Sequence, residues 1–186
     1  METCFVIMPI GDQVYKDITL SAQELRAKYN DLIKECWLKA KPNLDITRAN
    51  DISIPGSITT DIFTRIMHSK YVIVDITYPN PNVFYELGIR HAISNKTILI
   101  KEKGVNIKVF DISYLRYIEY ENNATGLKKL TENLKTTFEW LDKYPEKADN
   151  HFLELAELTK FKYPKFVDYF EIEKKKKKVF RAFLES

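Results

Sequence analysis

The sequence predicts an α/β fold: a three-layer sandwich with a mainly parallel sheet of about five strands, followed by a helical C-terminal extension. Short apolar runs alternate with longer segments whose apolar residues recur at three- and four-residue steps, as in repeated βα units. The first run, CFVIMPI at residues 4–10, is apolar without interruption, which is typical of a central parallel strand buried on both faces. Repeated βα units imply right-handed crossovers, which place helices on both faces of the sheet.

The expected elements follow from these runs and from the breaks between them. Gly11 and Pro55-Gly56 interrupt the chain, and Asn80-Pro81 is a helix-start signal. The predicted strands are 4–10, 44–48, 71–76 and 97–101, with the alternating segment 114–121 as a fifth strand at the sheet edge. The predicted helices are 16–40, one that carries Ile58, Ile62 and Ile66, 82–94, 126–144, 151–160 and 165–183. Five strands of this size most often follow the flavodoxin-like order.

Length and composition bound the domain organisation. A chain of 186 residues, 45% hydrophobic and 30% charged, is expected to form a globular protein with one main domain. We assign residues 1–145 to the α/β domain and residues 146–186 to a helical, lysine-rich extension. The five consecutive lysines at 174–178 are most simply a solvated face. Alternatively, the extension docks on the core, pairs with a second subunit or touches an anionic surface; we favour docking or a homo-oligomer.

Charge and cysteine usage exclude several classes of protein. The formal net charge of +3 is too small to indicate nucleic-acid binding. Cys4 and Cys36 lie in apolar patterns, so we expect small buried residues rather than a disulfide framework or a zinc site. No run approaches the length of a membrane span, and no signal peptide is evident. We therefore expect a cytoplasmic protein without a metal or a membrane partner.

The strongest functional signal is the segment VIVDITYPNPNVFYELGIRHA at residues 72–92, which predicts a buried strand, a sharp turn and a helix. Asp75 ends the apolar run, and Glu86 falls about one and a half turns into the helix. Both carboxylates are expected near the carboxyl end of the strand, where open α/β sheets bind ligands. The alternative is that they form structural ion pairs at a strand–helix junction.

The loop after the first strand supplies further candidates. Gly11 permits close backbone approach to a ligand, and Asp12 could accept hydrogen bonds from a sugar hydroxyl. An ordinary βα turn is the simpler interpretation. The expected binding residues of this loop and its strand are Phe5, Met8, Pro9, Gly11 and Asp12.

Three more candidate binding residues lie at the end of the second strand and in the loop that follows it. Arg48 could pair with a phosphate or with Asp75, and Asp51 could cap the segment that follows. Ser57 opens a helix, where backbone N–H groups could contact a phosphate or ribose, although capping is the simpler account. There is no GxGxxG and no GxxxxGK[ST] motif, which argues against a typical dehydrogenase or P-loop NTPase. His68 and His91 stand alone, without metal-ligand spacing.

Two carboxylates at a cleft suit the cleavage of a glycosidic bond. An ionised Glu86 could attack an anomeric carbon or stabilise an oxocarbenium-like centre, while Asp75 positions hydroxyls or moves a proton to the leaving base. This chemistry needs neither a metal nor a cofactor. Four aromatic residues could stack on a base or could equally be core: Phe5, Tyr78, Phe84 and Tyr85.

The segments FVIMPIGD, RANDI, PGSI, VIVDITYPNPNVFYELGIRHA, KTILI and VFDISYLRYIEY occur in this order along the chain. Over roughly Cys4 to Tyr120 this series resembles the nucleoside 2-deoxyribosyltransferase-like superfamily and, more closely, its bacterial TIR-like branch. The resemblance implies a flavodoxin-like or Rossmann-like fold, Glu86 as the catalytic glutamate and Asp75 as the residue that orients the sugar. It also implies that Met8 to Asp12 line a ribose pocket. Within NPNVFYELG, the expected substrate-binding residues are Asn80, Asn82 and Tyr85.

One position departs from the transferase pattern. Those enzymes place a second acid about six residues before the glutamate, where this chain has Asn80. Exchange of deoxyribose between free bases is therefore in doubt. TIR-like relatives act on NAD+ at the nicotinamide–ribose bond, often in antiphage defence, and this suits a single glutamate better. We thus expect a nucleoside or nucleotide substrate, with NAD+ among the candidates. A nucleotide sensor without turnover and a scaffold that works through its tail are the alternatives.

Overall fold

The computed structural model describes residues 1–15, 18–49, 58–105 and 115–162. The chain divides into two compact units, Met1–Glu154 and Leu155–Ser186.

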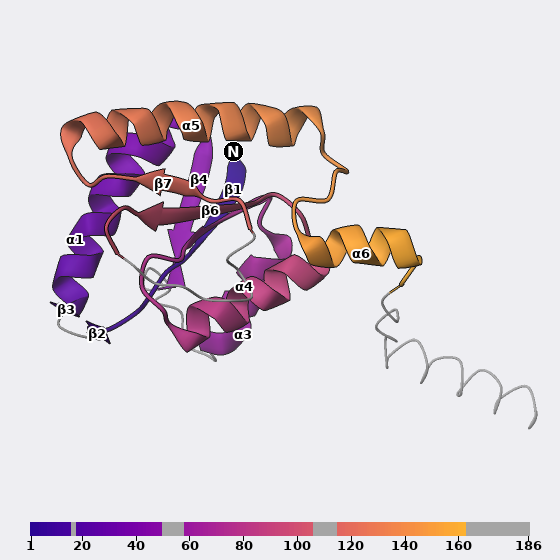
Figure 1. Cartoon of the computed structure of the whole chain (residues 1–186), viewed down its shortest axis with the longest axis horizontal. Coiled ribbons are helices and arrows are strands. Elements are labelled where there is room, and N and C mark those ends of the chain that lie inside the picture. The colour runs from indigo at the N-terminus through magenta and orange to yellow at the C-terminus, as the bar shows by residue number, and fades with distance from the viewer. Residues whose placement is uncertain (16–17, 50–57, 106–114, 163–186) are drawn as a thin grey trace, which may run out of the picture. The chain divides into compact units, whose positions relative to one another are not determined.

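A five-stranded parallel sheet forms the centre of the first unit (Figure 1). Its strands are β1 (Glu2–Ile7), β4 (Leu44–Arg48), β5 (Tyr71–Asp75), β6 (Thr97–Glu102) and β7 (Ile118–Tyr120). They lie in the order β4-β1-β5-β6-β7, and every neighbouring pair is parallel. Counted along the chain, this is the order 2-1-3-4-5 of flavodoxin-like sheets. The predicted fold class and the parallel direction of the strands are confirmed, and the strand order is the flavodoxin-like one that is most frequent for such sheets.

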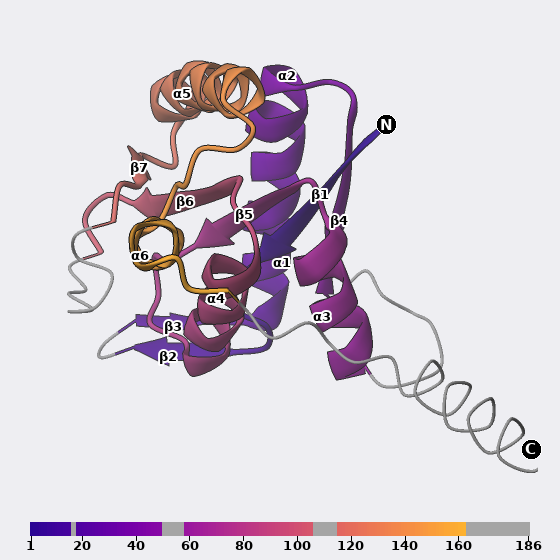
Figure 2. The same cartoon turned by 90° about the vertical axis from the view of Figure 1, so that its right-hand side faces the viewer.

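Helices cover both faces of the sheet, and alternate strand residues point to each layer. One layer contains α1 (Ala22–Leu32), α2 (Leu38–Ala40) and α5 (Ala124–Lys143), which pack on strand residues such as Val6 and Ile73. The other layer contains α3 (Ile58–His68) and α4 (Pro81–Ile93), which pack on Phe5 and Val74. Figure 2 shows α5 beside α2, and α3 beside α4.

The predicted helix at residues 16–40 is wrong in its first turn. An antiparallel hairpin of β2 (Gln13–Tyr15) and β3 (Ile18–Leu20) precedes α1. The helix begins after Ser21, whose hydroxyl accepts from the Glu24 N–H while the Glu24 carboxylate accepts from the Ser21 N–H. This reciprocal capping box fixes the start of α1.

A π-helix, η1 (Ile33–Trp37), separates α1 from α2. The π-turn is wider than an α-turn, so it rotates the residues that follow it relative to those before it. Cys36 and Trp37 both lie on the buried face, where neither is exposed. Both cysteines are buried and unpaired, and burial raises the pKa of the Cys4 thiol to about 12.

The first unit extends past the boundary predicted at residues 145/146, because the segment after α5 is hydrogen-bonded to the sheet layer. The Asp149 carboxylate accepts from the Thr97 N–H at 2.7 Å, and the Asn95 side-chain amide donates to the Pro145 carbonyl at 2.7 Å. Helix α6 (His151–Thr159) crosses into the second unit. The predicted helix 165–183 and the lysine run lie outside the described residues. None of the helices in the described ranges is long and apolar enough to cross a membrane.

Candidate functional site

The strand order creates one favoured position for a ligand. From β1 the chain crosses to β4 on one side, whereas from β5 it crosses to β6 on the other. Ligands of open α/β sheets bind in the crevice at the carboxyl ends of two such strands. In this protein that position lies between the loop Met8–Asp12 and the loop Ile76–Asn80.

A hydrogen-bonded glutamine joins these two loops. The Gln13 amide nitrogen donates to the carbonyls of Ile10, Gly11 and Asp12 at 3.0, 3.3 and 3.1 Å. Its amide oxygen accepts from the Asn80 side chain at 3.0 Å. Gly11 has φ +77°, a left-handed conformation that favours glycine. Gln13 was not predicted, because a lone glutamine after the loop belongs to no recognisable motif.

The other residues predicted in this loop serve the fold. The Asp12 carboxylate accepts from the Ala22 N–H at 2.7 Å and so helps to close the start of α1. Phe5 is 1% exposed in the α3–α4 layer, and Met8 is 5% exposed in the opposite layer. Pro9 is also buried. The described structure therefore places these side chains in the core or at a helix cap.

The start of α4 matches the prediction from Asn80-Pro81. The Asn80 side chain accepts from the N–H groups of Asn82 and Val83 at 2.9 and 3.3 Å, and Pro81 takes the first helical position. Asn82 is exposed, and Tyr85 is 63% exposed with its ring at an edge-on angle to Phe63. Asn82 and Tyr85 are therefore accessible to a ligand. Phe84 and Tyr78 contribute to the core instead.

Glu86 lies in the second turn of α4 and is half-buried. It makes no hydrogen bond and no ion pair with any residue in the described ranges. Burial alone raises the pKa of its carboxyl from the ordinary 4.5 to about 7. A carboxyl of this kind changes its charge near neutral pH, which is the range required for proton transfer and charge stabilisation in catalysis.

Asp75 is fully buried, and both of its carboxylate oxygens accept hydrogen bonds. One carboxylate oxygen accepts from the Tyr29 hydroxyl at 2.7 Å, and the other accepts from the Thr77 N–H at 2.8 Å. Tyr29 belongs to α1, whereas Glu86 is carried by α4 in the opposite layer. The structure thus gives no support to the expected convergence of Asp75 and Glu86 on one cleft. Asp75 instead holds the turn that leads to Asn80.

A half-buried lysine accompanies Asp75. The Lys28 ammonium pairs with the Glu102 carboxylate at 2.6 Å and lies 5.3 and 5.8 Å from the ring centroids of Tyr78 and Tyr120. Burial lowers the pKa of Lys28, but the negative charges of Asp75 and Glu102 outweigh it, so the pKa is raised. This cluster was not predicted. The sequence did carry one signal for it: Lys28 lies three residues after Leu25 and four before Leu32, on the apolar side of the predicted helix.

Arg48 is buried, and its guanidinium donates to the Asn30 side chain at 3.0 Å. The suggested pairing of Arg48 with Asp75 is not formed, because the Asp75 oxygens accept from Tyr29 and Thr77. Asp51 and Ser57 lie outside the described residues. Within the described ranges, no three His, Cys, Asp or Glu side chains are grouped as metal ligands would be.

The comparisons with known proteins add no assignment. Neither the protein-family models nor the curated protein sequences give a match to this chain.

The Tyr29–Asp75 hydrogen bond gives a test of the structural role of Asp75. Tyr29→Phe removes the hydroxyl and leaves a buried carboxylate oxygen without its donor, so the free energy of unfolding should fall by about 1–3 kcal/mol. Urea unfolding measures the change. The exposed Tyr85→Phe is the matched control and should change stability by less than about 0.5 kcal/mol. Equal effects of the two substitutions would contradict a buried, hydrogen-bonded Asp75.

Proposed function

We propose that the protein cleaves or transfers the N-glycosidic bond of a nucleoside or nucleotide in the cytoplasm, with Glu86 as the catalytic carboxylate and NAD+ among the candidate substrates. The observation that carries the proposal is the environment of Glu86. Glu86 is half-buried and has no partner among the described residues. Its ionised form therefore destabilises the fold, because no described hydrogen bond or ion pair compensates for the burial of the charge. Its position on the helix that follows the central strand β5 supports a role at the ligand-binding edge of the sheet.

The proposed chemistry uses the ionised form of Glu86. As the bond between the sugar and the base breaks, positive charge develops at the anomeric carbon, and the carboxylate stabilises it or bonds to it. Water or an acceptor base then completes hydrolysis or transfer. Gln13 and Asn80 hold the two loops at the site, and Asp75 acts as a positioning residue through the Thr77 N–H.

The pH dependence follows from the raised pKa. Below about pH 7 the Glu86 carboxyl is protonated, so kcat/KM should rise with pH through about 7 and then level off. Steady-state rates between about pH 3.5 and pH 9 measure this limb. The variant Glu132→Gln, at an exposed glutamate of α5, should keep the same profile. A limb near the ordinary 4.5 of a solvated glutamate would argue against Glu86 as the ionising group.

The direct experiment is to incubate the purified protein with NAD+ and with a panel of ribo- and deoxyribonucleosides, and to measure released base by chromatography. Release by the parent protein, together with its loss in Glu86→Gln, supports the proposal. Adding a second free base separates transfer from hydrolysis, because only transfer yields the exchanged nucleoside.

A nucleotide-binding module without turnover is the second candidate. The burial of Asp75 favours it, because Asp75 is then not accessible to act with Glu86 as the second carboxylate expected of a glycosidase. Calorimetric binding of a nucleotide, with no base released over hours, would select this candidate over the enzyme.

A further inference from the structure

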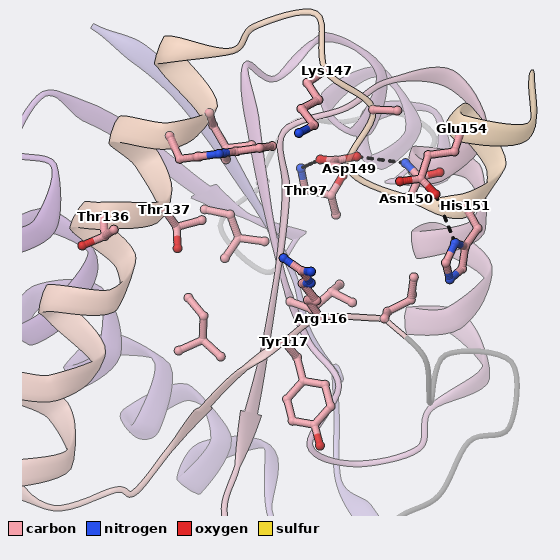
Figure 3. A pocket seen from close by; sticks show the side chains of 17 residues that line it. Thr97, Arg116, Tyr117, Thr136, Thr137, Lys147, Asp149, Asn150, His151 and Glu154 are labelled. Atoms are coloured by element: carbon pink, nitrogen blue, oxygen red, sulfur yellow. Dashed lines mark hydrogen bonds and ion pairs between the residues drawn. The ribbon is translucent and has the colours of Figure 1, made fainter. Parts of the chain in front are cut away.

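A cavity lies away from the candidate site. Strand β7 pairs with β6 only at Ile100–Glu102, so the first three residues of β6, Thr97–Leu99, have no described strand beside them on that side. A cavity of about 750 Å³ occupies this place, between β6, the chain that enters β7, the end of α5 and the segment 147–154 (Figure 3). We call it the edge cavity. None of the predicted site residues lines it.

The size and the apolar wall of the edge cavity suit a small organic molecule. Ligand pockets usually measure about 300–1,000 Å³ and are mainly apolar with a few polar groups. Here the apolar side chains are Ile98, Leu99, Leu115, Ile118, Trp140 and Leu141.

The two carboxylates that line the edge cavity already have hydrogen-bond or ion-pair partners. Asp149 accepts from the Thr97 N–H at 2.7 Å and from the Asn150 side chain at 3.0 Å. Glu154 lies 3.3 Å from the His151 ring nitrogen. Figure 3 shows these contacts as dashed lines on one side of the cavity. Little negative charge is therefore left for a cationic ligand.

The positive groups, in contrast, are available. Arg116 forms no hydrogen bond or ion pair with the described residues, and its guanidinium reaches into the edge cavity (Figure 3). Lys147 has no carboxylate partner among those residues, and its ammonium lies 5.3 Å from the Trp140 ring centroid. Thr97 also lines the cavity, but its buried hydroxyl, which has no described hydrogen-bond partner, is not accessible from it.

We propose that the edge cavity binds an organic anion with a flat apolar body. Arg116 and Lys147 bind its charged end, and the wall formed by Ile98, Trp140 and Leu141 contacts its apolar body. A guanidinium binds carboxylate, sulfonate and phosphate oxygens through two parallel hydrogen bonds, so all three anions share the required chemistry.

The test uses naphthalene-2-sulfonate as the probe and neutral 2-naphthol as its matched control, with isothermal titration calorimetry for affinity. Two-dimensional NMR follows the indole N–H groups of Trp140 and of the buried Trp37. The sulfonate should bind more tightly than the naphthol and shift the Trp140 signal but not that of Trp37. Arg116→Gln should weaken sulfonate binding about 10-fold or more. Arg26→Gln, at an exposed arginine of α1, should not.

Three outcomes would overturn the proposal: equal affinity for sulfonate and naphthol, equal affinity of the parent and Arg116→Gln, or an unshifted Trp140 signal. Competition with adenosine 5′-monophosphate shows whether the natural ligand is a nucleotide. If it is, adenosine 5′-monophosphate should displace the sulfonate. If the natural ligand is a simple aromatic acid, adenosine 5′-monophosphate should not displace the sulfonate. Glu86→Gln should bind the sulfonate like the parent. The result is therefore independent of whether the protein cleaves glycosidic bonds.

Discussion

Glu86→Gln should abolish most activity and at the same time stabilise the protein at alkaline pH. The amide keeps the size of the side chain but cannot carry the charge that stabilises the transition state, so kcat should fall by at least about 10²-fold. The KM should change little, because the interaction is made mainly in the transition state. Base release from the substrate identified in the nucleoside panel measures both constants.

The gain in stability follows from the raised pKa of Glu86. In the folded protein its carboxyl has a pKa of about 7, against 4.5 ordinarily, so the stability of the protonated form is fully present below about pH 4.5 and is lost as pH rises through about 7. At pH 8 the buried charge costs on the order of 1–3 kcal/mol. Glu86→Gln should therefore raise Tm at pH 8 by about 2–10 °C. The gain should shrink towards pH 5.

Glu132→Gln is the control for this variant, since it removes one exposed negative charge from α5. It should leave both Tm and turnover within error at either pH. A Glu86→Gln protein that loses stability at pH 8 would show that the carboxylate is a structural partner. The catalytic proposal would then lose its main support.

Arg90→Met should cause the largest loss of stability among the described residues that we consider. The Arg90 side chain is fully buried, and its guanidinium donates to the carbonyls of Ile66, Ser69, Lys70 and Asn95. These carbonyls lie at the end of α3 and at the turn after α4, so one side chain joins both helices of that layer. Methionine fills a similar volume but leaves the carbonyls unpaired, so the free energy of unfolding should fall by about 3–5 kcal/mol.

Urea unfolding measures this loss against Arg26→Met, which removes an exposed arginine from α1 and should cost less than about 0.5 kcal/mol. Arg90→Lys should fall between the two, because one ammonium replaces the planar guanidinium and reaches fewer carbonyls. A cost for Arg90→Met no larger than that for Arg26→Met would contradict the described arrangement of α3 and α4.

The fold could be predicted because each central strand is a continuous apolar run and each crossover helix has its own apolar stripe. The hairpin at Gln13–Leu20 was missed because the polar, helix-compatible composition after Tyr15 outweighed a short β-branched pair, Ile18-Thr19. The Ser21-x-x-Glu24 capping box was the signal that would have placed the helix start correctly.

The candidate site could be predicted only in part. Asn80 and Pro81 start a helix by local rules, and the structure confirms them. The layer to which Asp75 points could not be read, because a strand buried on both faces has no polar face to set the phase of its alternation. The pairing of Lys28 with Glu102 joins residues far apart in the chain, and single-sequence patterns carry no information on such contacts.

The bond between Thr97 and Asp149 has a consequence for aggregation. The first three residues of β6 have no described strand beside them on the β7 side, and unpaired strand edges are templates on which strands of other molecules can pair. The Asp149 carboxylate takes the Thr97 N–H that an incoming strand would need and places a negative charge in its path. Asp149 therefore hinders the addition of a strand from a second molecule at this edge, beside the edge cavity.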